Sequence, residues 1–184
     1  MNSILELDAR LTNQMRVAER PGALRAIAVF FAHSGDSWFW AIGLVAIWLS
    51  GNSFWKQWAV VQFGSISMLA IMVQVIKFRI KRKRPEGEWG RIYRFTDPHS
   101  FPSGHAARAF LIATIASGLG PPGLAIALWI WAPLVALARV AMGVHYLSDI
   151  VAGALFGILV ALIGLQVYQP WLTWMFNLLG FSLW

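Results

Sequence analysis

Long apolar stretches with almost no charged side chain are the feature that most limits how this chain can fold. Residues 57–76 and 124–141 are each long enough to cross the roughly 30 Å of a bilayer core as a helix. Hydrophobic residues make up 58% of the sequence and charged residues 12%, against a usual charged share of about 25%. Many of the 11 tryptophans flank apolar stretches, as aromatic residues do at membrane surfaces. We therefore predict an all-α, polytopic membrane helix bundle.

The apolar stretches fit a single membrane-embedded domain over residues 1–184, a length that suits one domain. Residues 22–50 are interrupted at residues 33–36 by His-Ser-Gly-Asp, so they form either two short spans or one span with a half-buried lead-in. We favour two short spans, because Gly35 and Asp36 are poorly placed in hydrocarbon. The bundle would then contain about six transmembrane helices. A full span needs roughly 20 apolar residues, and the two spans within residues 22–50 would be shorter.

The N-terminal segment, residues 1–20, is expected to form an amphipathic helix that lies in the membrane interface. Its leucines, among them Leu5 and Leu11, fall mostly along one side, and charged residues occupy the other positions. It has no long apolar centre and no small-residue cleavage site, so it does not resemble a cleaved signal peptide.

The basic residues are unevenly distributed. The net charge is +7, and eight of the 15 lysines and arginines lie between Lys77 and Arg94. Such a block beside a membrane most often binds lipid headgroups or sets topology. Nucleic-acid binding is excluded, because the rest of the chain is mostly lipid-soluble. The absence of cysteine excludes disulfides, thiolate metal sites and a cysteine nucleophile.

Three polar clusters stand at the ends of apolar stretches, within residues 77–149. They cover residues 77–85, 101–108 and 139–149. Polar groups of this kind are costly in a bilayer unless something offsets the cost. Because successive spans alternate in direction, all three clusters are expected at one membrane face, where their charges can bind a phosphate.

The first two clusters both offer anion-binding groups. Lys77 and Arg84 are seven residues apart, which places them on one face of a continuous helix. Ser103, Gly104 and His105 open a helix, whose free N–H groups attract anions, although Ser103 can equally be a plain N-cap. For the remaining basic residues of the first cluster, lipid-headgroup anchoring is favoured. These residues are Arg79, Lys81, Arg82 and Lys83.

The third cluster contains a histidine and a carboxylate at helical spacing. His145 and Asp149 are four residues apart, so the carboxylate can fix the tautomer of the ring and leave its other nitrogen as a nucleophile. Arg139 lies at the membrane edge nearby. Two histidines and a carboxylate, His105, His145 and Asp149, could also hold a metal ion. We favour no metal, because the surrounding lysines and arginines repel cations.

Together the clusters resemble the type-2 phosphatidic acid phosphatase superfamily. Its signature is Lys, six residues, Arg-Pro; then Pro-Ser-Gly-His; then Ser-Arg, five residues, His, three residues, Asp. The matching positions are Lys77, Arg84, Pro85, Pro102, Ser103, Gly104, His105, Arg139, His145 and Asp149. Every spacing within the clusters fits. Ala138 departs from the pattern, since it stands where the family usually has serine.

The resemblance implies a lipid phosphatase that uses no cofactor. His145 would attack phosphorus and form a phosphohistidine, Asp149 would orient His145, and His105 would protonate the leaving oxygen. Five groups would stabilise the phosphate oxygens: Lys77, Arg84, Ser103, Gly104 and Arg139. The substrate would be an isoprenoid diphosphate, phosphatidic acid or phosphatidylglycerophosphate, with the active site on the outer face of the cell membrane.

A second hypothesis is a non-catalytic membrane protein whose polybasic loop binds anionic lipids. Under that hypothesis, neutralising Lys81, Arg82 and Lys83 would matter more than losing His145. It leaves His105 and Asp149 unexplained, so we favour the enzyme.

Overall fold

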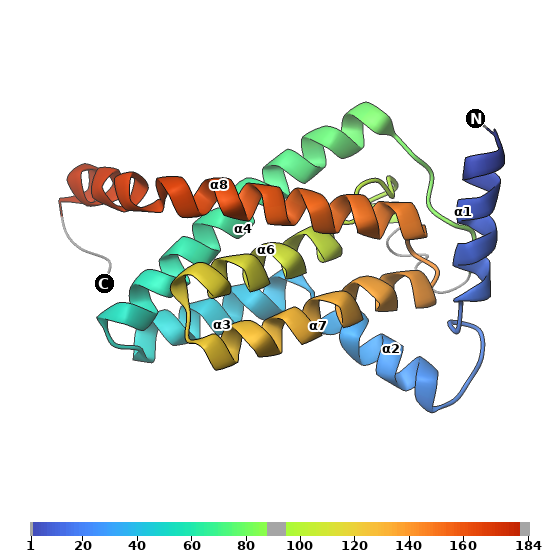
Figure 1. The fold of residues 1–184 in the computed structure, drawn as a ribbon, viewed down its shortest axis with the longest axis horizontal. Coiled ribbons are helices and arrows are strands. Elements are labelled where there is room, and N and C mark those ends of the chain that lie inside the picture. Colours follow the sequence, from blue (N-terminus) through green and yellow to red (C-terminus); the bar gives the residue numbers. More distant parts are fainter. Residues whose placement is uncertain (1, 88–94, 181–184) are drawn as a thin grey trace.

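The structure is a computed structural model that describes residues 2–87 and 95–180, and the described regular structure is helical. Figure 1 shows α1 lying across one end of a bundle formed by the other helices. The helices are α1 (Asn2–Gln14), α2 (Ala23–Ser34), α3 (Ser37–Ser50), α4 (Ser53–Ile80), α6 (Gly104–Leu119), α7 (Pro122–Ala141) and α8 (Leu147–Leu179).

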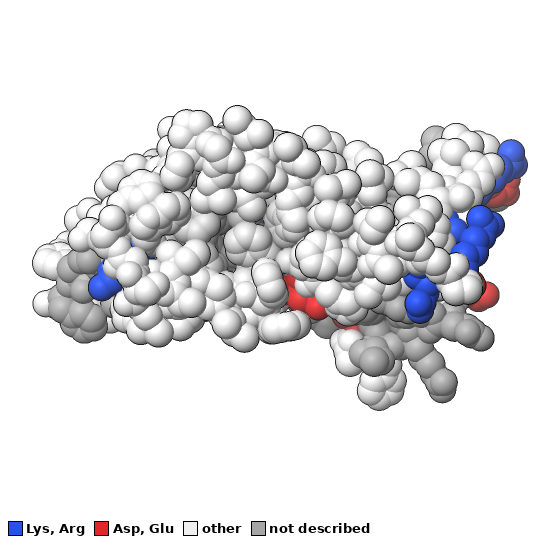
Figure 2. Space-filling model, turned by 90° about the horizontal axis from the view of Figure 1, so that it is seen from below, with Lys and Arg blue, Asp and Glu red and all other residues white. Residues whose placement is uncertain are grey.

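Within the described residues, three helices are long and apolar enough to cross a membrane, namely α4, α7 and α8. The shortest of them, α7, has 20 residues, which span about 30 Å at 1.5 Å per residue. Large apolar side chains on these helices, such as Phe63, Ile130 and Leu155, face outward. Figure 2 shows lysine and arginine gathered mainly at the end that carries α1, beside a broad uncharged surface. The integral-membrane fold predicted from composition is therefore confirmed.

The predicted count of about six spans is not confirmed. Helices α2 and α3 have 12 and 14 residues, and each is too short to cross alone. They follow one another in the same direction, away from α1 and along the bundle, as two halves of one passage (Figure 1). Contacts with α7 support this course, because Ala32 lies near Arg139 and Ser34 bonds to Trp131. The expectation of two separate spans is not confirmed, and at the break between α2 and α3 Gly35 is buried and Asp36 is partly buried.

Helix α6 lies at the centre of the bundle and is packed most closely against α8. Its buried residues include Ala106, Ala107 and Ile112. On α8, a Cβ atom added at Gly157 would lie 2.0 Å from the carbonyl oxygen of Ala107, and one added at Gly153 would lie 2.5 Å from that of Ser103. The two backbones therefore touch, as small residues allow in membrane helix pairs. This contact fixes the start of α6 beside the start of α8.

Helix α1 packs with its polar side inward. Asp8 and Thr12 are buried against the start of α8, and Leu5, Leu7 and Leu11 are exposed. Figure 1 shows α1 nearly perpendicular to α8. An exposed apolar row on a helix that crosses the end of the bundle suits the boundary between headgroups and acyl chains.

Candidate active site

The ends of four helices lie toward the end of the bundle that carries α1. Helices α4 and α7 end there, and α6 and α8 begin there (Figure 1). A cavity of about 320 Å³ lies between them. Six of the eight residues predicted for the site line it: Lys77, Arg84, Gly104, His105, Arg139 and His145. Ile66, Leu69 and Ala70 line the same cavity farther along α4, so its walls pass from polar to apolar toward the bundle interior.

Lys77 and Arg84 converge on one carboxylate, that of Asp97. Lys77 Nζ forms an ion pair with Asp97 Oδ2, and the Nη2 of Arg84 lies 2.9 Å from the same oxygen. The expectation that both cations lie on one continuous helix was wrong. Helix α4 ends at Ile80, and Lys81 has the left-handed conformation (φ 53°), which turns the chain before Arg84. The turn brings Arg84 back over the cavity.

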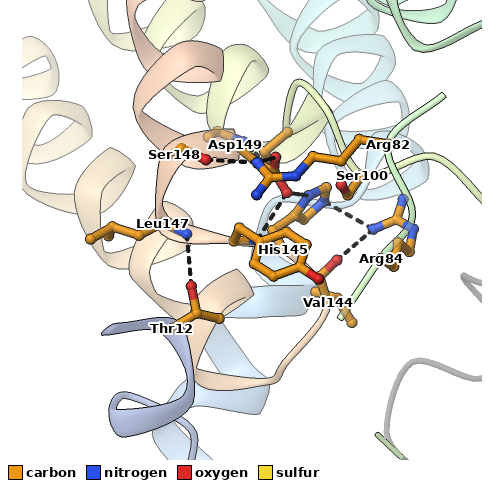
Figure 3. A network of polar contacts seen from close by, with 12 residues as sticks. Thr12, Arg82, Arg84, Ser100, Val144, His145, Leu147, Ser148 and Asp149 are labelled. Atoms are coloured by element: carbon orange, nitrogen blue, oxygen red, sulfur yellow. Dashed lines mark hydrogen bonds and ion pairs between the residues drawn. The ribbon is translucent and has the colours of Figure 1, made fainter. Parts of the chain in front are cut away.

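His145 lies between Asp149 and Arg84 (Figure 3). Its Nδ1 is 3.5 Å from Asp149 Oδ2, and its Nε2 is 3.1 Å from the Nη1 of Arg84. Arg84 can only donate, so Nε2 accepts and the proton of the neutral ring is on Nδ1, facing the carboxylate. Burial, the largest influence, lowers the pKa of His145 to about 3, against the opposing effect of Asp149. The nucleophilic lone pair is therefore present at neutral pH and is lost only as the pH falls toward that value.

His105 is held by a carboxylate that sequence reasoning missed. The Nε2 of His105 lies 2.8 Å from Asp36 Oδ1, and the Nδ1 of His33 lies 3.0 Å from Asp36 Oδ2. In the sequence, Asp36 indicated only a break in an apolar stretch, and no residue at an informative spacing suggested a partner for His33. The spacing of 69 residues between Asp36 and His105 leaves no local signal. Only the broken passage of α2 and α3 brings the two together.

The second cluster is joined to the third through Ser103. Its hydroxyl caps α6 by accepting from the N–H of Ala106 at 3.4 Å, and its own N–H donates to the carbonyl of Asp149 at 3.0 Å. Gly104 lines the cavity, and a Cβ atom added there would lie 3.6 Å from Val73 Cγ1, an ordinary van der Waals contact. A phosphate can approach this helix start closely. The contact of Ser103 with phosphate remains a prediction.

Two arginines lie deep in the wall. Arg139 is fully buried, with Nη1 3.4 Å from the carbonyl of Ala32. Arg108 donates to the carbonyl of Gly35 and, at 2.6 Å, to the hydroxyl of Ser37. Both support the break between α2 and α3 and add positive charge to the cavity. Positive charge at the cavity wall favours an anion in the cavity.

The departure at Ala138 has a local explanation. Ala138 is buried in a small apolar cluster with Ala28, Ala32 and Met142, where α2 packs against α7. A serine hydroxyl there would face methyl groups of α2. The alanine therefore fits the contact between these helices, and Arg139 beside it still reaches the cavity.

Arg82 was assigned to lipid headgroups, and this assignment was wrong. Its side chain turns inward, where Nη1 lies 2.7 Å from Asp149 Oδ1 (Figure 3). Its Nη2 lies 2.7 Å from Asp8 Oδ2. No sequence signal separates Arg82 from Lys81 and Lys83, because its partners are 67 and 74 residues away.

These features define a membrane-embedded helical protein with an anion-binding cavity that contains two histidines. Residues 58–173 match the PAP2 superfamily. The chain is 32% identical to a decaprenylphosphoryl-5-phosphoribose phosphatase of Mycobacterium tuberculosis, over 83% of this chain and 84% of that protein. It is 34% identical to the protein of the same name from Mycolicibacterium smegmatis, over 76% of each.

Solved structures show the same fold. The PAP2-type phosphatidylglycerolphosphate phosphatase of Bacillus subtilis aligns with a TM-score of 0.74 at 22% identity, over 92% of this chain and 88% of that one. LpxE of Aquifex aeolicus aligns with a TM-score of 0.69 at 28% identity, over 88% and 94%. The chain belongs to the PAP2 superfamily. The prediction of a membrane-embedded lipid phosphatase is confirmed at this level.

Proposed function

We propose that this protein removes a terminal phosphate from a lipid through a phosphohistidine on His145. The observation that carries the proposal is the single cavity in which two histidines and the cations Lys77, Arg84 and Arg139 face one another. Phosphoryl transfer depends mainly on positioning and on neutralising charge, and the cavity offers both. Its apolar continuation along α4 suits the lipid chain that carries the phosphate.

In the first step, the Nε2 lone pair of His145 forms the N–P bond while the P–O bond to the lipid breaks. The departing oxygen takes a proton from His105. Arg84 now donates to Nε2 and shares Asp97 with Lys77, so a bound phosphate would take over these contacts and release the lone pair. Asp149 stabilises the positive charge that develops on the ring.

In the second step, water attacks phosphorus and gives a proton to His105. The N–P bond breaks, its electron pair returns to His145, and inorganic phosphate leaves. Lys77, Arg84, Ser103, the Gly104 backbone and Arg139 would hold the phosphate oxygens throughout. No step needs a metal ion, because side-chain cations supply the positive charge.

The substrate class follows from the relatives that match most of this chain. They are named for a phosphate carried on a decaprenyl-linked ribose. We therefore place a polyprenyl-linked sugar phosphate ahead of phosphatidic acid, phosphatidylglycerophosphate and isoprenoid diphosphates. The long apolar continuation of the cavity is compatible with each of these chains, so the headgroup decides among them.

A phosphate-release assay over these four substrates tests the proposal. Purified protein in detergent should release phosphate fastest from the polyprenyl-linked sugar phosphate, and EDTA should leave the rate unchanged. Adding excess Mg²⁺ to a matched preparation should also leave the rate of phosphate release unchanged. Release that EDTA abolishes and added metal restores would contradict the metal-free mechanism, and absence of release from every lipid would contradict the function.

We further propose that the active-site end lies at the outer face of the cell membrane. Counting basic residues alone would place it inside. Much of that charge is paired, however: Arg82 with Asp8 and Asp149, and both Lys77 and Arg84 with Asp97. The free positive charge that sets topology is therefore smaller than the sequence count.

A single cysteine decides the orientation, since the chain has none of its own. Glu86 is exposed on the connection that leaves α4, beside the site. In intact cells, Glu86→Cys should react with a membrane-impermeant thiol reagent, and Lys56→Cys, at the opposite end near the start of α4, should react only after permeabilisation. The reverse pattern would place the site in the cytoplasm.

A further inference from the structure

Asp149 is fully buried, and its closest charged partner is not His145. Its Oδ1 lies 2.7 Å from the Nη1 of Arg82, whereas its Oδ2 lies 3.5 Å from the His145 ring. An arginine–carboxylate contact of this length is a strong, charge-assisted hydrogen bond. Arg82, which lies in a different cluster of the sequence, therefore helps to set the orientation of Asp149, together with the N–H of Tyr146.

The two oxygens of Asp149 have separate tasks. Oδ1 accepts from Arg82, and Oδ2 accepts from the N–H of Tyr146 at 2.9 Å and faces His145 Nδ1. With Oδ1 fixed, the carboxylate cannot rotate without breaking the contact to Arg82. Oδ2 is thereby held at the ring nitrogen that must carry the proton while the other nitrogen attacks.

Arg82 is in turn fixed by α1. Its Nη2 lies 2.7 Å from Asp8 Oδ2, and its guanidinium lies 4.0 Å from the centre of the Tyr146 ring. Asp8 also accepts from Ser148, from the N–H at 3.0 Å and from the hydroxyl at 2.5 Å. The Ser148 hydroxyl accepts from Arg82 at 2.7 Å (Figure 3). Both terminal nitrogens of Arg82 therefore donate to a carboxylate, Nη1 also to Ser148, and Asp8 is buried.

We propose that Arg82 and Asp8 are positioning residues of the reaction, through which the interfacial helix α1 fixes Asp149 and thereby His145. The proposal rests on the proposed function of His145. Neither residue lines the cavity, so their effect must pass through Asp149. A guanidinium suits this position, because its planar fork presents donors to Asp8, Ser148 and Asp149 at once, whereas an ammonium is a compact point charge.

The first test compares four variants by steady-state kinetics on the lipid substrate that the release assay selects. Arg82→Met should lower kcat by about 10- to 100-fold, the range found for outer partners of metal-bound groups, with KM little changed. Asp8→Asn should lower kcat less, and Arg82→Lys should recover part of the loss, since lysine keeps the positive charge but not the planar fork of donors. Lys83→Met is the matched control: it removes an exposed positive charge from the same segment and should leave kcat unchanged.

A double-mutant cycle separates positioning from a general loss of structure. In the Asp149→Asn background, Arg82→Met should have almost no further effect on kcat, because the group on which it acts is already altered. A full additional loss in that background would overturn the proposal. The proposal would also be overturned if Arg82→Met had the same kcat as Lys83→Met. If Arg82→Met does not fold, as judged by its thermal unfolding in detergent, the cycle is run with Asp8→Asn and Arg82→Lys.

The proposed function is checked separately in the wild-type protein, by isolating the phosphorylated enzyme and locating the phosphate. Phosphate on His145 together with additive losses in the cycle would overturn only the positioning role. Absence of phosphate from His145 would overturn the proposed function, whatever the cycle shows.

Discussion

Replacing His145 by alanine should abolish phosphate release and leave the fold intact. We expect the rate to fall by about 10⁴-fold or more, because loss of the nucleophile in a covalent enzyme costs up to about 10⁶-fold. Without the imidazole, no N–P bond can form, so the covalent route is closed even though the cations of the cavity remain. The remaining cations can still bind the substrate, so substrate binding should persist.

The fold should tolerate this change because the neighbours of His145 have other partners. Arg84 retains the carbonyls of Val144, at 2.8 Å, and Asp97, at 2.6 Å. Asp149 retains Arg82 and the N–H of Tyr146. No charged group is left buried and unpaired, which is the usual cause of severe destabilisation.

The measurement is phosphate release together with thermal unfolding in detergent. His99→Ala is the matched control, because His99 lies on the same connection as Asp97 and packs edge-on against Phe78. We expect its activity to stay close to that of the wild type. A folded His145→Ala protein that retained turnover would rule out the phosphohistidine mechanism and would favour the polybasic lipid-binding hypothesis.

The parts of this structure that the sequence predicted are those encoded by local spacing. Apolar stretches longer than a bilayer core predicted the helices, since hydrocarbon allows few other conformations of the backbone. Alternation of the spans from residue 57 onward predicted that the ends bearing Lys77, His105 and His145 would meet. The internal spacing of the three clusters predicted the family, because the joint pattern is far more specific than any one cluster.

The parts that could not be predicted depend on contacts between distant segments. Asp36 and Asp8 act on the site from elements that precede it by 69 and more residues. Arg82 is indistinguishable from its basic neighbours until the left-handed turn at Lys81 is known. The joining of α2 and α3 into one passage was missed for a related reason. The polar groups at the break would be unfavourable in lipid, but in the protein they form hydrogen bonds with Arg108, His105 and Trp131.

Replacing His105 by alanine should slow the reaction with the natural lipid and change which step limits turnover. A positioned general acid contributes about 10²- to 10⁴-fold, and we expect a loss of that size for an alkyl leaving group. An aryl phosphate such as p-nitrophenyl phosphate needs no protonation of its leaving oxygen. Its first step should therefore be nearly normal in His105→Ala.

The second step should remain slow for both substrates, because His105 also accepts the proton of the attacking water. His105→Ala given the aryl phosphate should then release about one equivalent of p-nitrophenol in a burst and accumulate the phosphoenzyme, the usual sign of a covalent intermediate whose breakdown is slow. The trapped phosphate should be labile to acid and stable to alkali, as expected for a phosphorus–nitrogen bond.

The two histidine variants thus give opposite results in the same assay. His145→Ala should show neither burst nor trapped phosphate, whereas His105→Ala should show both. Equal losses for alkyl and aryl substrates in His105→Ala, without a burst, would mean that the ring only shapes the cavity. Asp36→Asn provides an intermediate case: it keeps the shape of the side chain but removes the charge from the hydrogen bond to His105. If Asp36 acts by holding His105 in place, Asp36→Asn should show a smaller burst and a smaller difference between alkyl and aryl substrates than His105→Ala.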